Sequence, residues 1–205
     1  MSDVIKIVLT GGSNSGKTEL INKIAELYDN NKFVVAIVPE AATQLLQEGI
    51  KPDKHFQKKV AYRQLATEVE FYYDIIWYPE FRGSKDNRII LFDRSFMDQL
   101  AYCSKDEWQA CMSEVLDTTS FDESVELLNE RYDVVIHLES NARYKHVAEG
   151  RLETQEEAIE LEKKTLRANQ YFKDLYYVER QDNIEDKVNE VVDIIDYELR
   201  ERGMK

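Results

Sequence analysis

Eight consecutive residues near the N-terminus combine glycines, a lysine and a hydroxyl side chain at a fixed spacing. They match the pattern G-x4-G-K-[ST] in full, as Gly11, Gly12, Ser13, Asn14, Ser15, Gly16, Lys17 and Thr18. In such a loop the glycines let successive backbone N–H groups point at one phosphate, the lysine reaches the outer phosphates, and the last hydroxyl ligates Mg²⁺. The segment therefore predicts a site for the polyphosphate of a nucleotide, with Lys17 as a catalytic cation and Thr18 as a metal ligand.

Glu40 follows an apolar run at residues 33–38, and Pro39 ends that run. In a parallel α/β sheet, ligands bind outside the carboxyl ends of the strands, so we expect Glu40 at the edge of the nucleotide site. A carboxylate in that place can accept the proton of an attacking hydroxyl. The alternative is that Glu40 only complements the dipole of the helix that follows it.

The third strand-like run ends in an acid, an arginine and a serine. Four apolar residues precede Asp93, which is the form of a Walker-B strand and predicts that Asp93 holds Mg²⁺ together with Thr18. Arg94 is expected to position an acceptor molecule, and Ser95 to cap the next helix. Glu139, at the end of the fourth run, is the competing magnesium ligand. Asp93 is preferred because the two residues after it also have uses in such a site.

Two further side chains complete the expected site. Arg151 lies beside Gly150 in a polar segment, and an arginine that closes over a transferred phosphoryl group contributes about 10³–10⁵ in rate in other systems. The alternative for Arg151 is a solvated basic turn on an acidic protein. Gln64 lies on a long helix predicted over residues 53–78, from which it is expected to contact the acceptor.

Five strand-like runs separated by helical patterns must position these residues. They are Ile5–Leu9, Phe33–Val38, Arg88–Phe92, Asp133–Leu138 and Leu175–Val178. The alternation predicts an α/β protein with the three-layer P-loop NTPase fold, in which helices flank a five-stranded parallel sheet. No linker rich in Pro, Gly or Ser interrupts the 205 residues, so residues 1–205 are predicted to form one domain.

Two of the predicted helices show contrasting patterns. The helix over residues 53–78 has an apolar stripe that is expected to face the core, formed by Phe56, Val60, Leu65, Val69, Tyr72, Ile75 and Ile76. Residues 156–170 alternate acidic and basic side chains. This second pattern predicts an exposed helix whose charges serve only solvation.

The charge balance and the cysteines narrow the classes of partner. The chain has 27 basic and 40 acidic residues and a net charge of -13, which disfavours binding to nucleic acid or to anionic lipid. Cys103 and Cys111 are too few and too far apart for a zinc ribbon, and neither a secretory signal nor an apolar stretch of membrane length is present. We expect a cytoplasmic protein whose partners are a nucleotide and a small-molecule acceptor, with its oligomeric state left open.

The motifs together resemble those of one family. The phosphate loop, Val-Pro-Glu-Ala-Ala-Thr at 38–43, Leu-Phe-Asp-Arg-Ser at 91–95 and Arg-Leu-Glu at 151–153 are similar to the AAA-type P-loop domain shared by the ribosylnicotinamide-kinase part of bacterial NadR proteins and the TTD14 proteins. In similar nucleoside kinases a glutamate after the second strand is the base, and an acid-Arg-Ser triplet ends the third strand. The resemblance implies these roles for Glu40, Asp93 and Arg94.

Motifs and resemblance together imply a Mg²⁺-dependent kinase that uses ATP, or alternatively GTP, to phosphorylate a nucleoside or ribosyl compound. Its expected catalytic residues are Lys17, Glu40, Asp93, Arg94 and Arg151, and Glu40, Arg94 and Gln64 are expected to bind the acceptor. The alternative is a nucleotide-binding regulatory ATPase or GTPase that acts as a switch through protein partners, because TTD14 proteins share the loop and resemble regulators.

Overall fold

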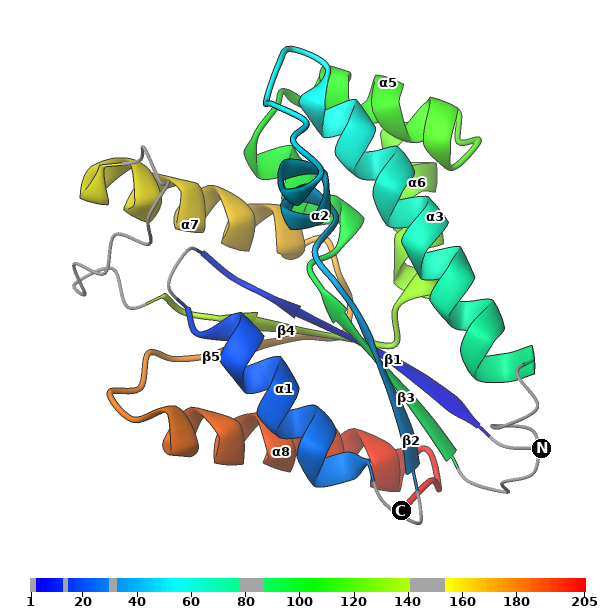
Figure 1. Ribbon diagram of the computed structural model, residues 1–205, viewed down its shortest axis with the longest axis vertical. Coiled ribbons are helices and arrows are strands. Elements are labelled where there is room, and N and C mark those ends of the chain that lie inside the picture. Colours follow the sequence, from blue (N-terminus) through cyan, green and yellow to red (C-terminus); the bar gives the residue numbers. More distant parts are fainter. Residues whose placement is uncertain (1–2, 13–14, 30–32, 78–86, 141–153) are drawn as a thin grey trace.

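The centre of the protein is a sheet in which every neighbouring pair of strands is parallel (Figure 1). The strand order is β2-β3-β1-β4-β5. The strands are β1 Val4–Thr10, β2 Phe33–Val38, β3 Asn87–Asp93, β4 Val134–Leu138 and β5 Leu175–Val178. All five predicted strands are confirmed, and their boundaries differ from the prediction by at most one residue.

The computed structural model describes residues 3–12, 15–29, 33–77, 87–140 and 154–205. Of the residues predicted for the site, Ser13, Asn14 and Arg151 lie outside these ranges.

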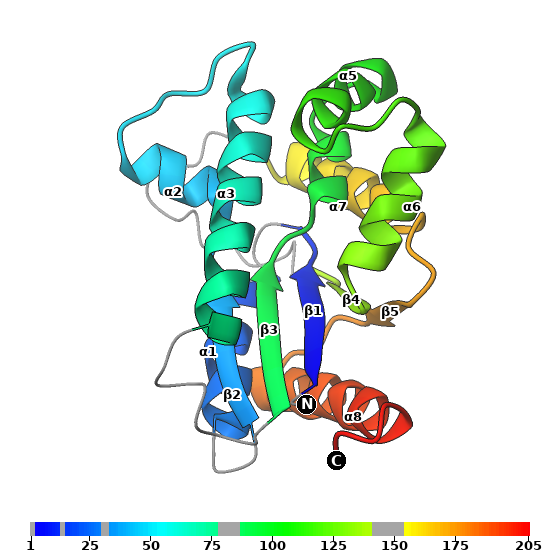
Figure 2. The same ribbon diagram turned by 90° about the vertical axis from the view of Figure 1, so that its right-hand side faces the viewer.

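Helices cover both faces of the sheet, as Figures 1 and 2 show. One face packs against α1 (Lys17–Tyr28) and α8 (Ile184–Glu201). The other packs against a larger group, made of α3 (Phe56–Trp77), the short helix η1 (Phe96–Ala101), α5 (Lys105–Val115) and α6 (Phe121–Arg131). Above the strand ends, α2 (Ala41–Gln47) packs on α3, and α7 (Gln155–Asn169) packs on η1. The predicted three-layer α/β fold is therefore confirmed.

Alternating side chains of β1 hold the two helical layers on the sheet. Ile5, Ile7 and Leu9 contact the layer of α1 and α8, while Val8 contacts the opposite layer, and all four are fully buried. Successive side chains of a strand point to opposite faces, which explains the alternation. Full burial of such a side chain contributes about 1.5–3 kcal/mol, so the middle of the sheet is a firm base for the loops at its edge.

The stripe predicted along α3 is only partly buried. Val69 and Tyr72 are 40% and 42% exposed. At this height the helix instead buries the polar residues Gln64, Thr67 and Glu68. The rest of the predicted stripe is confirmed: Phe56, Val60 and Ile75 are buried, and Leu65 and Ile76 pack against buried apolar residues. The prediction is wrong only for Val69 and Tyr72, because the side of the helix that is buried at their height carries hydrogen-bonded polar residues. Among the described helices of the chain, none combines the length and apolar character needed to cross a membrane.

The register of the sheet brings the predicted site residues together. Leu9 of β1 pairs with Asp93 of β3, and Val38 of β2 pairs with Phe92 of the same strand. Because β3 lies between β1 and β2, its last residues lie between the phosphate loop on one side and Glu40 on the other.

Candidate active site

The phosphate loop joins the end of β1 to the start of α1 through backbone that requires glycine. Gly11 has φ 134° and Gly16, the N-cap of α1, has φ 81°. A Cβ atom on Gly11 would lie 2.1 Å from the carbonyl oxygen of Leu138 in β4, far inside contact distance. The glycines that the motif supplies thus allow the loop to pass close to the neighbouring strand and turn into the helix.

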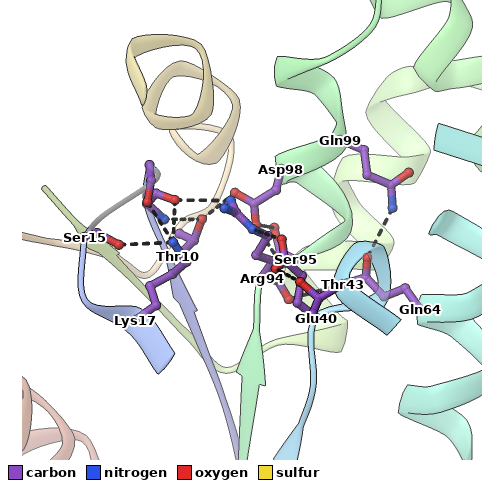
Figure 3. A network of polar contacts seen from close by, with 12 residues as sticks. Thr10, Ser15, Lys17, Glu40, Thr43, Gln64, Arg94, Ser95, Asp98 and Gln99 are labelled. Atoms are coloured by element: carbon purple, nitrogen blue, oxygen red, sulfur yellow. Dashed lines mark hydrogen bonds and ion pairs between the residues drawn. The ribbon is translucent and has the colours of Figure 1, made fainter. Parts of the chain in front are cut away.

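Lys17 lies in the first turn of α1 with its ammonium group inside the loop (Figure 3). Its Nζ donates hydrogen bonds to the carbonyl oxygens of Gly11 at 2.9 Å and Gly12 at 2.8 Å, and to Ser15 Oγ at 3.1 Å. Burial, together with the positive charge of Arg94, lowers the pKa of Lys17 to about 7. Lysines of such loops reach the outer phosphates of a nucleotide, and Lys17 is placed for that contact.

Arg94 connects the end of β3 to both neighbouring strand ends. Its Nε donates to Glu40 Oε1 at 2.6 Å, and its Nη1 donates to the Gly11 carbonyl oxygen at 3.2 Å (Figure 3). The backbone of Arg94 has φ 81°, a conformation that L residues rarely adopt, and its N–H donates to the Leu9 carbonyl oxygen at 3.1 Å. The structure therefore brings Glu40, Arg94 and the phosphate loop into one hydrogen-bonded group.

Glu40 is the N-cap residue of α2, but its side chain makes no capping hydrogen bond. Its two carboxylate oxygens accept hydrogen bonds from Arg94 and, at 2.6 Å, from Thr43 Oγ1. Burial tends to raise the pKa of Glu40, but the charges of Arg94 and Lys17 and the hydrogen bond from Thr43 outweigh it and hold the pKa below its usual range. Glu40 is therefore an ionised acceptor at neutral pH.

Asp93 has an oxygen that suits a metal ion. Its Oδ1 is buried and has no hydrogen-bond partner among the described residues. Burial and the negative charge of Glu40 raise the pKa of Asp93 to about 6, against the opposing charges of Lys17 and Arg94. An orphaned carboxylate oxygen fits a hard cation such as Mg²⁺.

The other metal ligands expected from the sequence differ in their surroundings. Thr18 is exposed in the first turn of α1. Glu139, the competing ligand, accepts a hydrogen bond at 2.8 Å from the backbone N–H of Arg180, so one of its oxygens is already used. No cluster of three or more His, Cys, Asp or Glu side chains suited to a metal occurs in the described ranges. A cation here would depend on few protein ligands, which is how Mg²⁺ binds with substrate phosphates and water.

Gln64 lies behind Arg94 and is 7% exposed. Its Nε2 donates to Glu68 Oε1 at 2.9 Å, its Oε1 accepts from Gln99 Nε2 at 3.2 Å, and Nε2 also lies 3.5 Å from the Arg94 carbonyl oxygen. The amide group thus supports the backbone of Arg94 from the α3 side. Contact of Gln64 with an acceptor stays a prediction, as does the lid role of Arg151, which lies outside the described residues.

Sequence reasoning missed two carboxylates beside the phosphate loop. Glu162 of α7 accepts a hydrogen bond at 2.7 Å from the Ser140 N–H, and a Cβ atom on Gly12 would lie 2.6 Å from its Oε2. The expectation that the charges of this helix serve solvation alone is wrong for Glu162, because α7 packs on η1 and turns this side chain toward the loop.

The second carboxylate is Asp98 of η1, which is buried and bonded to Thr10. Only the spacing of Ser95 and Asp98, typical of a capping box, signals it in the sequence.

A pocket of about 410 Å³ lies away from these residues. Its described lining comes mainly from α3 and α6 and includes Val69, Tyr72, Tyr73, Leu127 and Arg131. Of the described residues that hydrogen-bond to Lys17, Glu40 or Arg94, none lines this pocket. Its lining does include Glu68, which bonds to Gln64. The candidate active site is therefore identified by its chemistry and its place at the strand ends, not by the size of a cavity.

A phosphate loop between β1 and α1, on a parallel sheet with helices on both faces, defines the P-loop NTPase fold. A family model described as an AAA domain matches residues 6–187. The chain belongs to this AAA-domain family, which confirms the resemblance of its motifs to a NadR-type P-loop domain.

Solved structures with this fold include two that bear on its function. Thymidylate kinase from Ehrlichia chaffeensis has a TM-score of 0.54 and 16% identity, with 94% of this chain and 99% of the kinase covered. A NadR protein in complex with NAD and AMP-PNP has a TM-score of 0.53 and 15% identity, with 87% of this chain but 45% of the NadR chain covered. At these identities the similarity concerns the fold. Among curated proteins, none matches the chain in sequence.

Proposed function

We propose that the protein transfers the γ-phosphoryl group of ATP, with GTP as the alternative donor, to a hydroxyl group of a nucleoside or another ribosyl compound. The observation that carries the proposal is the Glu40–Arg94 pair, joined at 2.6 Å and bonded to the phosphate loop through Gly11. The kinase-like fold and the family support it. Thymidylate and NAD, which the names of the two solved structures give, are both built from nucleosides, and this supports a nucleoside-like acceptor in general terms.

The Glu40–Arg94 pair supports a kinase over a nucleotide switch. A switch needs only water beside the γ-phosphate and loops that respond to it. A kinase also needs groups that hold and deprotonate an acceptor. Glu40 and Arg94 follow β2 and β3, the two strands on one side of the phosphate loop. We infer that the paired side chains belong to an acceptor site on that side, which a kinase needs and a switch does not.

In the proposed reaction, Lys17 exchanges its carbonyl partners for the outer phosphate oxygens of ATP. Arg94 positions the acceptor, and Glu40 accepts the proton of its hydroxyl as the new oxygen–phosphorus bond forms and the bond to the β-phosphate oxygen breaks. ADP leaves, and Glu40 returns its proton to solvent. General-base catalysis of this kind contributes about 10²–10⁴ in rate.

Asp93 and Thr18 are the residues that would hold Mg²⁺, with Asp93 Oδ1 as the buried ligand. When bound, the ion would neutralise part of the negative charge of the phosphates. Arg151 is proposed to close over the transferred group, and residues 1–205 are proposed to act as one domain.

A panel of acceptors tests the proposal. ATP consumption is measured with nicotinamide riboside, the common nucleosides and thymidylate, beside a well without acceptor and a Lys17→Ala variant. We expect consumption that depends on one class of acceptor and on Lys17. Equal hydrolysis in every well, still dependent on Lys17, would instead favour the regulatory switch.

A further inference from the structure

Asp98 is a buried carboxylate that joins three elements beside the phosphate loop. It is 2% exposed and lies in the first turn of η1. Its Oδ1 accepts hydrogen bonds from Thr10 Oγ1 and, at 3.0 Å, from Asn169 Nδ2 at the end of α7. Its Oδ2 accepts from the Ser95 N–H at 2.6 Å. One side chain therefore ties the end of β1, the turn after β3 and α7 together, as Figure 3 shows for Thr10 and Ser95.

The bond to Thr10 determines how the phosphate loop begins. Thr10 is fully buried at the end of β1, and its hydroxyl has one hydrogen, which it donates to Asp98. The same oxygen accepts the N–H of Gly11 at 2.7 Å. Because Asp98 takes the hydrogen, the lone pairs of the hydroxyl face Gly11, whose carbonyl oxygen in turn contacts Lys17 and Arg94.

The bond to Ser95 holds the other side of the site. Ser95 follows Arg94, whose positive φ is unfavourable for an L residue. The Arg94 N–H is held by the Leu9 carbonyl oxygen, and the next N–H, that of Ser95, is held by Asp98. Asp98 thus supports the backbone conformation that directs Arg94 toward Glu40 and Gly11.

Two other capping boxes of the described chain show what a helix cap alone needs. In the boxes of α5 and α7, Glu107 and Glu157 are exposed, and among the described residues they bond only to their own N-cap residues, Ser104 and Thr154. Asp98 makes the same cap for η1 but is buried and also bonds to β1 and α7. Capping does not require these additional bonds.

We propose that Asp98 is a positioning residue of the nucleotide site, which sets the start of the phosphate loop through Thr10 and the Arg94 turn through Ser95. The role concerns nucleotide binding in the first place, and it bears on phosphoryl transfer only as far as the proposed function holds. Asp98 does not itself touch the nucleotide. It acts through Thr10, Gly11 and Arg94.

Paired variants of Thr10 test this role without changing Asp98 itself. Thr10→Val keeps the shape of the side chain but removes the hydroxyl, and Thr10→Ser keeps the hydroxyl. The dissociation constant of MgATP is measured by isothermal titration calorimetry on folded protein, verified by circular dichroism. We expect Thr10→Val and Asp98→Asn to weaken MgATP binding about 10- to 100-fold, the effect of leaving a buried hydrogen-bonding group without its partner.

Thr10→Ser should retain most of the affinity, and Glu107→Gln, which removes an exposed capping carboxylate, is the matched control. With an acceptor that the panel identifies, the KM for ATP should rise in Thr10→Val while the KM for the acceptor stays unchanged. MgATP binding as tight in Thr10→Val as in Thr10→Ser would overturn the role of Asp98. If Thr10→Val weakens MgATP binding but the wild-type protein phosphorylates no acceptor of the panel, the result supports the role of Asp98 and contradicts the proposed kinase function.

Discussion

Arg94 combines an unfavourable backbone conformation with two side-chain contacts that depend on it. Its φ of 81° falls where L side chains carry strain, at a cost of about 1–3 kcal/mol. The same conformation lets the side chain bond to Glu40 and to the Gly11 carbonyl oxygen. Strain of this size persists where surrounding bonds determine the conformation, and here Leu9 and Asp98 hold the backbone on either side. The residue thereby links the nucleotide loop to the proposed acceptor side.

The first prediction at this scale concerns catalysis by Glu40. Glu40→Gln keeps the size of the side chain but removes its ability to take a proton. We expect kcat to fall about 10²–10⁴-fold while MgATP binding changes little. The measurement is steady-state turnover with the best acceptor, together with calorimetric binding of MgATP.

Glu48→Gln provides the matched control for that variant. Glu48 also pairs with an arginine, Arg63 at 2.6 Å, but the pair is exposed at the end of α2. Its removal should leave turnover unchanged. Turnover in Glu40→Gln equal to that in Glu48→Gln would reduce Glu40 to a structural carboxylate.

The second prediction concerns stability and pH. Burial tends to raise the pKa of Glu40, but Arg94 and Thr43 lower it below the ordinary value of 4.5. The contribution of the ionised group is complete above about pH 4.5 and is lost as the pH falls toward the folded-state pKa, because the unfolded chain binds the proton first. The difference in free energy of unfolding between wild type and Glu40→Gln should therefore decrease on acidification. Denaturant unfolding across a pH series measures it, and a difference independent of pH would contradict the paired state of Glu40.

At the scale of elements, the parallel register explains why separate motifs form one site. The first, second and third strands all end at the same edge of the sheet, and β3 lies between the other two. That arrangement was predictable because alternating strand and helix patterns specify a parallel sheet, whose carboxyl ends bind ligands. The capping of η1 by Ser95 was predictable for the same local reason and is confirmed by its bond from the Met97 N–H at 3.1 Å.

The prediction at this scale separates two costs of replacing glycine. Gly11→Ala would place a methyl group 2.1 Å from the Leu138 carbonyl oxygen of β4, in addition to the strain of φ 134°. Gly49 also has a positive φ, 82°, but no atom lies within 4 Å of a Cβ added there, so Gly49→Ala has backbone strain without the close contact. We expect Gly49→Ala to lower the free energy of unfolding by about 1 kcal/mol and Gly11→Ala by clearly more, with loss of MgATP binding. Thermal unfolding of both variants tests this, and equal losses would contradict the close approach of β1 and β4.

At the scale of the whole molecule, the net charge of -13 contrasts with the local cations Lys17 and Arg94. A few local cations suffice for a small anion, whereas nucleic acid requires a basic surface that releases many counterions. We therefore predict that the protein neither binds a fluorescent single-stranded oligonucleotide at low salt nor phosphorylates its 5′-hydroxyl. Fluorescence anisotropy and the ATP assay test this, with MgATP binding as the positive control. Binding of the oligonucleotide that weakens steeply with salt would contradict the proposal that the acceptor is a small molecule.

Contiguous patterns determined the phosphate loop, the five strands and the positions of Glu40, Asp93 and Arg94 at strand ends. These follow from short-range chemistry, since loop glycines, apolar runs and breaking residues act within a few positions along the chain. Tertiary structure alone decided which polar residues are buried between elements. Asp98 bonds to Thr10 and Asn169, which lie far from it in sequence, and Glu162 reaches Gly12 from another helix. Buried polar groups must find partners wherever packing places them, so their pairing depends on how helices meet and leaves no local signature in the chain.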